Sequence, residues 1–257
     1  MKHFIKRFDA SRISIIPLGD FHYGSPQCNE PFILKTIDEI KHTDGAYVVL
    51  MSDLIENAIV GSRSDIYKQL VPPEAQIEWV IKTLLPIKDK LLFAIAGNHE
   101  QRTMRVVGLN PEQIICSRLM IPYKGFSCGA WFKLEKAKYG VFTCYFHHNW
   151  GGGYTPGGKV NRSRHLRDIF PSVDATFSAH LHTTGRTPSR VFDVGTDRIV
   201  EKIGYDYITG SALEYSDSYA EERAKPAAVT EFIKVTFVGG SSGSSDGRRQ
   251  EYEVISP

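Results

Sequence analysis

Six of the nine histidines of this 257-residue chain, with two aspartates and one asparagine, directly follow apolar segments that are typical of β-strands. These polar groups occur at five places: Asp20-Phe21-His22, Asp53, Asn98-His99, His147-His148 and His180-Leu181-His182. Carboxylate, imidazole and amide donors without a thiolate suit borderline divalent metals such as Mn, Fe, Zn, Co or Ni. The set has too many imidazoles for Ca²⁺ and too many ligands for one tetrahedral Zn²⁺. We therefore expect two bridged ions, manganese first among them, roughly 3.5–4 Å apart and able to generate a hydroxide at neutral pH.

Two of these places repeat one spacing. In an extended chain, side chains two residues apart point to the same side. Asp20 with His22, and His180 with His182, are therefore each expected to bind one cation together. Each motif alone has an ordinary explanation, such as a turn aspartate, a Gly-Asn turn or a packed histidine pair. All five follow a strand, in this order, and that joint pattern indicates one shared site.

The elements that must position these groups alternate in the first half of the chain. Apolar runs predict strands at Arg12–Leu18, Ala46–Met51 and Leu91–Ala96. Helix signals separate them, namely the spacing of Ile33, Ile37 and Ile40, the start Pro72-Pro73-Glu74, and the cap Asn110-Pro111-Glu112. Alternating strands and helices predict an α/β fold, in which groups that follow several strands meet at the carboxyl edge of the sheet.

The second half is mostly strands in this interpretation. The expected strands are Ala130–Leu134, Val141–Phe146, Ala175–Ser178, Tyr205–Ile208 and Thr230–Phe237, with a short helix near Arg164–Ile169. Gly239–Gly247 is predicted to be a long hairpin loop before the strand-like Glu251–Ile255. We assign the segment after Gly185 to a second sheet and its edge. No boundary divides the chain, so a single domain over residues 1–257 is expected.

Composition excludes several classes of protein. Apolar residues make up 42 % and charged residues 23 %, as in a folded globule, and the net charge of +2 does not indicate a nucleic-acid binder. No window approaches the roughly 20 apolar residues of a membrane span, and the start of the chain resembles a strand more than a signal peptide. Four separated cysteines do not suggest a disulfide framework. We expect a cytoplasmic protein without a membrane partner, and no protein partner is indicated.

The ordered motifs D-x-H, D-x-x-E, G-N-H-E, a single His and H-x-H resemble those of the calcineurin-like metallophosphoesterases. The match runs from Asp20 to His182, and some phage and prophage members are similar also in the Gly-rich stretch Gly151–Gly158. The resemblance implies two packed mixed β-sheets flanked by helices, a four-layer α/β/β/α sandwich. It implies a dinuclear phosphoesterase that uses a metal-bridging hydroxide.

The resemblance also implies residue roles. Asp20, His22 and His182 would bind the first metal, Asn98, His180 and His147 or His148 the second, and Asp53 both; His99 would be the general acid. Three departures from the family pattern are Ser52 and Ala179 in place of glycine, and Asn149 after the fourth-motif histidine. Because of Asn149 we favour His148 over His147. Dihedral angles that only glycine adopts are not expected to survive at the two substituted positions.

The sequence does not decide between several classes of substrate. Arg162 and Arg164, in the basic run after the Gly-rich stretch, are candidate phosphate-binding residues, and Trp150 and Tyr154 could stack a base or pack the loop. Glu100 and Arg102 could orient His99, contact phosphate or form a solvated face. A phosphodiester in DNA, RNA or a nucleotide is the first expectation. The alternatives are a phosphomonoester of a small molecule or phosphoprotein, and a non-catalytic metal-binding scaffold.

Overall fold

The computed structural model describes residues 2–149, 155–194, 199–222, 224, 227, 229–240 and 247–257. It has an α/β fold with one mixed sheet of eleven strands in the order β1-β5-β6-β7-β9-β10-β2-β3-β4, with β8 on β9 and β11 on β10. The strands are β1 (Lys2–Phe8), β2 (Arg12–Gly19), β3 (Ala46–Ser52), β4 (Leu91–Ala94), β5 (Ser127–Leu134), β6 (Val141–His147), β7 (Ala175–Ser178), β8 (Thr184–Val194), β9 (Ile199–Ser211), β10 (Glu231–Val238) and β11 (Arg249–Ile255). The helices are α1 (Glu30–His42), α2 (Pro73–Leu84), the 3₁₀ helix η1 (Leu85–Lys90), α3 (Glu100–Val107), α4 (Pro111–Leu119), α5 (Pro156–Ile169) and α6 (Tyr219–Glu222). The predicted α/β class is confirmed.

The first half of the chain forms three parallel strands, β2, β3 and β4, covered by α1, α2 and α4. Ile33, Ile37 and Ile40 are buried on one face of α1, as their spacing predicts. Asn110 caps α4 by accepting a hydrogen bond from the backbone N–H of Gln113 at 3.2 Å. These helices therefore fix the strands whose carboxyl ends carry the first three motifs.

A second core joins the two halves of the sheet. It contains side chains of β2, β3 and β4 together with those of β5, β6 and β7, and Phe93 packs edge-on against Phe146 with ring centroids 5.4 Å apart. The halves also connect through a short pairing of β9 with β10 at Gly210 and Ser211. Gly210 has φ +88°, and a Cβ there would lie 2.0 Å from the carbonyl oxygen of Glu231, so glycine is required.

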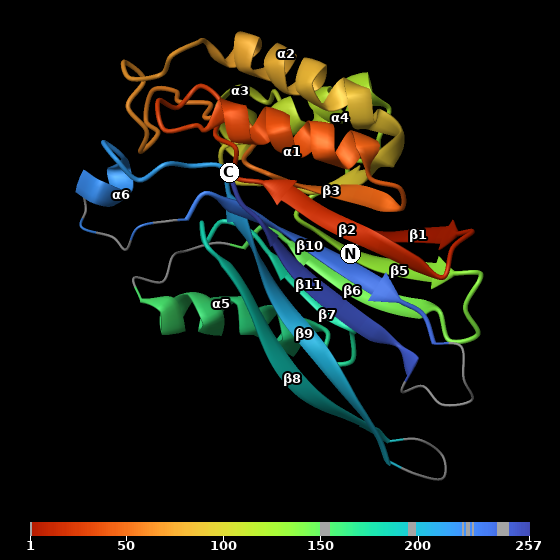
Figure 1. Ribbon diagram of the computed structural model, residues 1–257. Helices are drawn as coiled ribbons and strands as arrows, with labels where there is room; N and C mark the ends of the chain where they lie inside the picture. Colours follow the sequence, from red (N-terminus) through yellow and green to blue (C-terminus); the bar gives the residue numbers. More distant parts are fainter. Residues whose placement is uncertain are drawn as a thin grey trace.

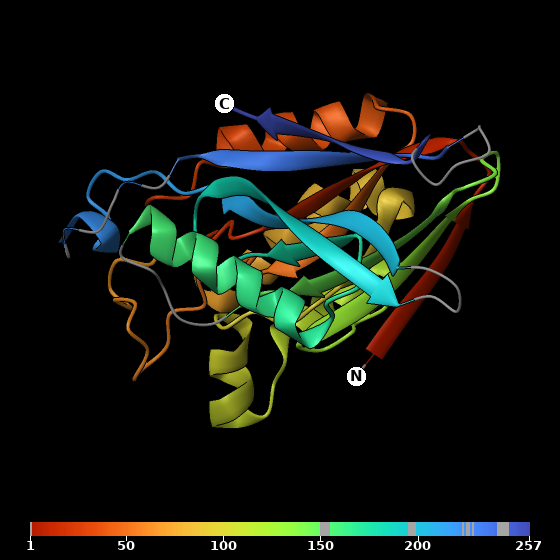
Figure 2. The same ribbon diagram turned by 90° about the horizontal axis from the view of Figure 1, so that it is seen from below.

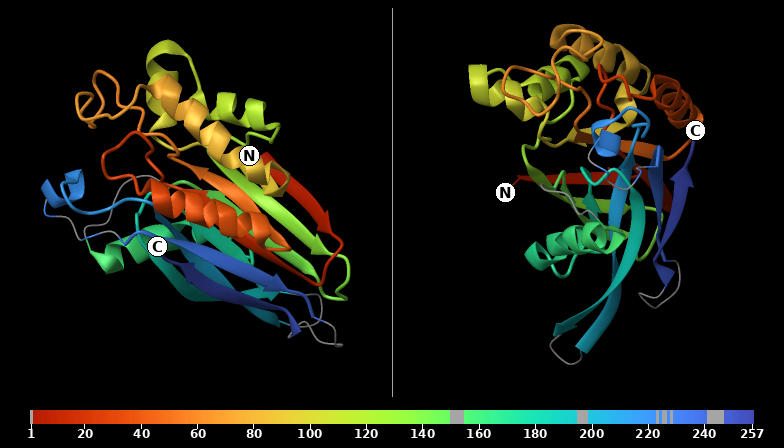
Figure 3. Two further views of the ribbon diagram at one scale, coloured as in Figure 1. Left: turned by 45° about the horizontal axis from the view of Figure 1, so that its top comes forward. Right: turned by 90° about the vertical axis from the view of Figure 1, so that its left-hand side faces the viewer.

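The helices lie on opposite sides of the strands. Figure 1 shows α1 to α4 on one side and α5 on the other, and Figure 2 shows α5 crossing close to β8 and β9, with β11 alongside β10. The loop between β3 and α2, the start of α5, and α6 gather at one end of the molecule, the end toward which β2 points (Figures 1 and 3). Within the described residues, no helix combines the length and apolar character that crossing a membrane requires.

Several predicted boundaries differ from the structure. The third strand ends at Ala94 instead of Ala96. α5 begins at Pro156, well before the predicted Arg164, because the side chain of Thr155 accepts a hydrogen bond from the backbone N–H of Gly158. The last three residues of the predicted Gly-rich loop are therefore the first turn of a helix, and residues 151–154 lie outside the described residues.

Two edge elements were not predicted in detail. β1 pairs in parallel with β5, whereas the start of the chain has only a general strand pattern in its sequence. β8 pairs with β9 at an edge, as expected. The segment after Gly185 does not form a second sheet, however, because β9 and β10 lie inside the single sheet, between β7 and β2. β10 and β11 form the predicted antiparallel hairpin, although residues 241–246 of its loop lie outside the described residues.

Candidate metal centre

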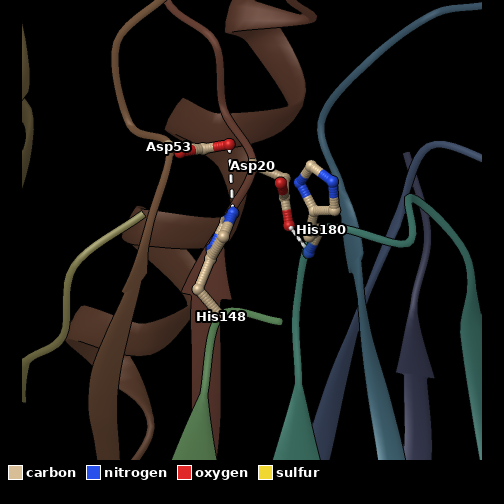
Figure 4. A group of neighbouring side chains, drawn as sticks. All are labelled: Asp20, Asp53, His148 and His180. Carbon is tan, nitrogen blue, oxygen red and sulfur yellow. Dashed lines mark hydrogen bonds and ion pairs between the residues drawn. The ribbon is translucent and has the colours of Figure 1, made fainter. Parts of the chain in front are cut away.

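Each of the five polar motifs follows the carboxyl end of a strand, namely β2, β3, β4, β6 and β7. β2, β3 and β4 are parallel to one another, and β6 is parallel to β7. The backbone N–H of Ala212, just after β9, donates to the carbonyl oxygen of Asp20 at 3.1 Å, which links the two halves of the sheet at this edge. Figure 4 shows side chains from β2, β3, β6 and β7 directed toward one another.

Three groups of buried or half-buried side chains have ligand atoms within 4.8 Å of one another and could each hold a metal ion. The first group is Asp20, Asp53, His148 and His180; the second is Asp20, His22 and His182; the third is His22, Asp53 and His99. The second group has the residues predicted for the first metal. Asp20 belongs to the first two groups, whereas the sequence assigned the shared position to Asp53, which belongs to the first and third.

The three ligand groups, together with the neighbouring Asn98, are called the cage below. His148 belongs to the first group, and His147 lies in none of the three. The Nδ1 atom of His148 donates to the carbonyl oxygen of Met51 at 2.6 Å, which turns Nε2 toward Asn98 Oδ1 at 3.2 Å and Asp53 Oδ2 at 3.1 Å. His147 instead accepts the backbone N–H of Asn149. The period of two along β6, with Phe142, Cys144 and Phe146 inward, extends to His148 and was the available sequence signal.

The backbone around the cage is not extended. Asp20, His22, His180 and His182 all have φ between 46° and 68°. The extended-chain argument for D-x-H and H-x-H was therefore wrong, although the side chains do converge. Non-glycine residues with positive φ are uncommon and cluster at functional sites, where the surroundings hold them.

Ser52 corrects another expectation, because it keeps a left-handed backbone with φ 70° although it is not glycine. Its carbonyl oxygen accepts the backbone N–H of Asp20 at 2.9 Å, which holds this conformation. Its hydroxyl lies 2.9 Å from Glu100 Oε2 and 2.7 Å from Glu112 Oε2, both fully buried. A serine side chain therefore has a use here that a glycine could not supply.

Gly97 allows Asp53 to face the cage. A Cβ at Gly97 would lie 2.2 Å from Asp53 Oδ1, so no side chain fits. Asp53 Oδ1 accepts the backbone N–H of His99 at 2.9 Å, which leaves Oδ2 directed toward the other ligands.

Within the described residues, three buried ligand atoms have no hydrogen bond: Nε2 of His22, Oδ2 of Asp53 and Nδ1 of His180. Oδ2 of Asp53 still faces Nε2 of His148 at 3.1 Å, so the two imidazole nitrogens are the unpaired atoms. Leaving a buried polar atom unpaired costs about 1–3 kcal/mol, so two such nitrogens at one site need an explanation. Cations held by the two groups that share Asp20 would use all three atoms, and nitrogen and oxygen donors without sulfur suit the borderline metals. The residues present therefore fit a metal.

The ionisation of the cage matches a site built for positive charge. Burial opposes the charged form, but the carboxylates of Asp20 and Glu56 raise the pKa of His22 to about 10. Burial likewise opposes protonation of His148, but Asp53 raises its pKa to about 9. The pKa of Asp20 is lowered by His182 and His22 in spite of burial. Without a metal, imidazolium ions balance the carboxylates.

Glu56 connects the first motif with α3. Its Oε2 atom lies 3.3 Å from Nδ1 of His22, and its Oε1 lies 3.7 Å from Nη1 of Arg102. Burial alone would raise the pKa of Glu56, but the hydrogen bond with His22 lowers it to about 2. A carboxylate behind a ligating histidine fixes the ring and makes its other nitrogen a better donor.

The hydrogen bonds of His99 disagree with the predicted role of general acid. Its Nδ1 atom lies 2.7 Å from the carbonyl oxygen of Glu56, and its Nε2 lies 2.8 Å from Nη2 of Arg102. A carbonyl can only accept and a guanidinium can only donate, so Nδ1 carries the proton and Nε2 accepts. Burial, with His22 and Arg102, lowers the pKa of His99 to about 3. In this arrangement Nε2 has no proton to donate.

The predicted phosphate-binding arginines lie on the surface of α5. Arg162 and Arg164 are exposed, and Arg164 lines a groove with Arg190 and Phe192 of β8. No described contact joins either side chain to the cage; only the carbonyl oxygen of Arg162 receives the Asn149 amide, at 3.4 Å. Trp150 and Tyr154 lie outside the described residues.

Comparison with known proteins identifies no relative. No protein-family model matches the chain, and no curated protein matches it either. The geometry of the site and the order of its motifs therefore carry the functional argument.

Proposed function

We propose that this chain is a divalent-metal-dependent phosphoesterase similar to the calcineurin-like metallophosphoesterases. The observation that carries the proposal is the pair of adjoining ligand groups that share Asp20 and contain two unpaired, buried imidazole nitrogens, those of His22 and His180. Two groups suit two cations, with manganese as the first candidate and iron, zinc, cobalt and nickel as alternatives. The ordered motifs from Asp20 to His182 add independent support.

The proposal includes the four-layer α/β/β/α arrangement of that family. Two features support it: the core that β2, β3 and β4 share with β5, β6 and β7, and the helices on opposite sides of the strands (Figure 1). The cytoplasm is the proposed compartment, supported by the four free cysteines.

Bound divalent cations oppose the negative charge of phosphoryl oxygens and activate water for attack on phosphorus. The chain itself binds and orients. The carbonyl oxygen of Met51 aims His148, the backbone N–H of His99 aims Asp53, and Glu56 aims His22. Such pre-set donors need no rearrangement during the reaction.

A phosphodiester in nucleic acid or a nucleotide is the proposed substrate class. It is supported by the similarity of the motif pattern to phage and prophage members and by the basic residues of α5. Hydrolysis of bis-p-nitrophenyl phosphate and of p-nitrophenyl phosphate, each with Mn²⁺, tests the reaction and the class together.

The matched pair for this test is Asp53→Asn and the exposed control Asp44→Asn. We expect Asp53→Asn to lose bound manganese, measured by elemental analysis, and at least about 100-fold in turnover. Asp44→Asn should behave like the wild type. Preferential monoester turnover would move the substrate to the phosphomonoester class. Bound metal without turnover of either ester would make the chain a metal-binding scaffold.

A further inference from the structure

The guanidinium of Arg102 lies at the rim of the metal cage, one turn of α3 after His99. One of its nitrogens, Nη1, donates to the carbonyl oxygen of Glu56 at 2.8 Å and to the hydroxyl of Ser64 at 3.0 Å. The side chain is 16 % exposed, so it is held firmly but still reaches solvent. Its Nη1 atom therefore anchors it to the loop between β3 and α2, which lies at the end of the molecule toward which β2 points (Figure 3).

The other terminal nitrogen, Nη2, faces the cage. It donates one hydrogen to Nε2 of His99 at 2.8 Å, and that atom lies 4.0 Å from Asp53 Oδ2. The lone pair of His99 Nε2 is therefore already used in a hydrogen bond. A cation in the third ligand group, which contains His99, would also be repelled by the positive charge of the Arg102 guanidinium. This separates His99 from the two groups that share Asp20.

A second Nη2 hydrogen has no acceptor among the described residues. Nη1 is held by backbone and hydroxyl oxygens, so the direction of this hydrogen is set in advance. Arginine hydrogen bonds to phosphate oxygens are strong because both partners are charged. An anion seated against the two ligand groups would meet this donor and the cations at once.

We propose that Arg102 is a phosphate-binding residue of this site, held in place by His99, Glu56 and Ser64. The proposal rests on the proposed phosphoesterase function for its choice of a phosphoryl group. Among the candidates that the sequence offered for a phosphate contact, it selects Arg102 over Arg162 and Arg164. The competing explanation is that Arg102 only ties the loop to α3.

Titration of inorganic phosphate into the manganese-loaded protein, followed by calorimetry, separates these explanations. We expect Arg102→Met to weaken phosphate binding about 10- to 100-fold while the manganese stoichiometry stays unchanged. Arg102→Lys keeps the charge but not the two-nitrogen fork. It should bind phosphate more weakly than the wild type and more tightly than Arg102→Met. Arg7→Met, at an exposed arginine of β1, is the matched control and should bind phosphate as the wild type does.

Ser64→Ala keeps the guanidinium but removes one of its anchors, so it serves where Arg102→Met does not fold. A purely structural role predicts that both variants lower Tm and leave the Kd for phosphate within twofold of the wild type. That result, or a manganese-loaded wild type that does not bind phosphate, overturns the proposal. A wild type that binds phosphate through Arg102 but hydrolyses neither ester contradicts only the proposed enzymatic function.

Discussion

The imidazole of His99 could assist ester hydrolysis by giving a proton or by holding a neighbour, and its hydrogen bonds favour the second. A general acid matters most when the leaving group is a poor one, and contributes typically 10²–10⁴-fold. Because Nε2 of His99 accepts from Arg102, we expect His99→Ala to cost about 10- to 100-fold equally on a p-nitrophenyl and on an alkyl diester. The measurement is kcat/KM for both esters.

The exposed His165→Ala on α5 is the control for this comparison, and Arg102→Met should show the same loss as His99→Ala. A loss at least tenfold greater on the alkyl ester would restore His99 as the proton donor. The backbone N–H of His99 still supports Asp53 in the alanine variant, so the metals should stay bound.

At the scale of elements, β3 meets α3 and α4 through three buried polar side chains. Ser52 lies within hydrogen-bond distance of both Glu100 and Glu112, but one hydroxyl has one hydrogen to donate. Glu100 also accepts the backbone N–H groups of Asp53 and Leu54, as a carboxylate does. Burial, with the charge of Glu100, raises the pKa of Glu112 well above its usual value. Ser52 therefore donates its one hydrogen to Glu100, and Glu112 is protonated and donates to the Ser52 hydroxyl oxygen.

This arrangement predicts how Glu112→Gln changes stability with pH. A carboxyl whose pKa is raised by folding stabilises the protein below its unfolded value of 4.5, and that contribution is lost as pH rises toward the folded pKa. Over that range, the difference in unfolding free energy should shift toward the glutamine variant by roughly 1.4 kcal/mol per pH unit. Chemical denaturation with a chelator present measures it, with exposed Glu39→Gln as control. A difference independent of pH would mean that Glu112 is ionised.

Sequence patterns predicted the positions of the strands and helices well, but they did not predict the backbone conformation of the residues at the site. The strands before the motifs and the cap of α4 follow from short-range rules, so Asp20, Asp53 and Asn98 could be placed at strand ends in advance. The positive φ of Ser52 and His180 depends on contacts between distant segments, and no local spacing encodes it. The same holds for Arg102, whose partners Glu56 and Ser64 lie in another loop.

At the scale of the whole molecule, the cage is a place where both halves of the sheet must meet. Asp20 and Asp53 come from one half, and His148 and His180 from the other, across the shared core (Figure 4). The backbone N–H of His180 donates to Asp20 Oδ2 at 2.9 Å, so the halves are joined at the site itself. A cation bound there would cross-link the two halves and stabilise the folded state by mass action.

That cross-link should strengthen as pH rises. The pKa values of His22 and His148, raised to about 10 and about 9, mean that both are charged at pH 7 without metal and must release protons to bind it. Each raised pKa also stabilises the metal-free fold below the unfolded value of 6.5, a contribution lost as pH rises through the folded one. Manganese affinity should therefore increase about tenfold per pH unit for each proton released, and the rise in Tm on adding manganese should be larger at pH 8.5 than at pH 6.

Scanning calorimetry with manganese or a chelator measures the shift in Tm, and titration in buffers of different ionisation enthalpy counts the protons released. An equal shift at both pH values, with no proton released, would show that these histidines are not where the metal binds.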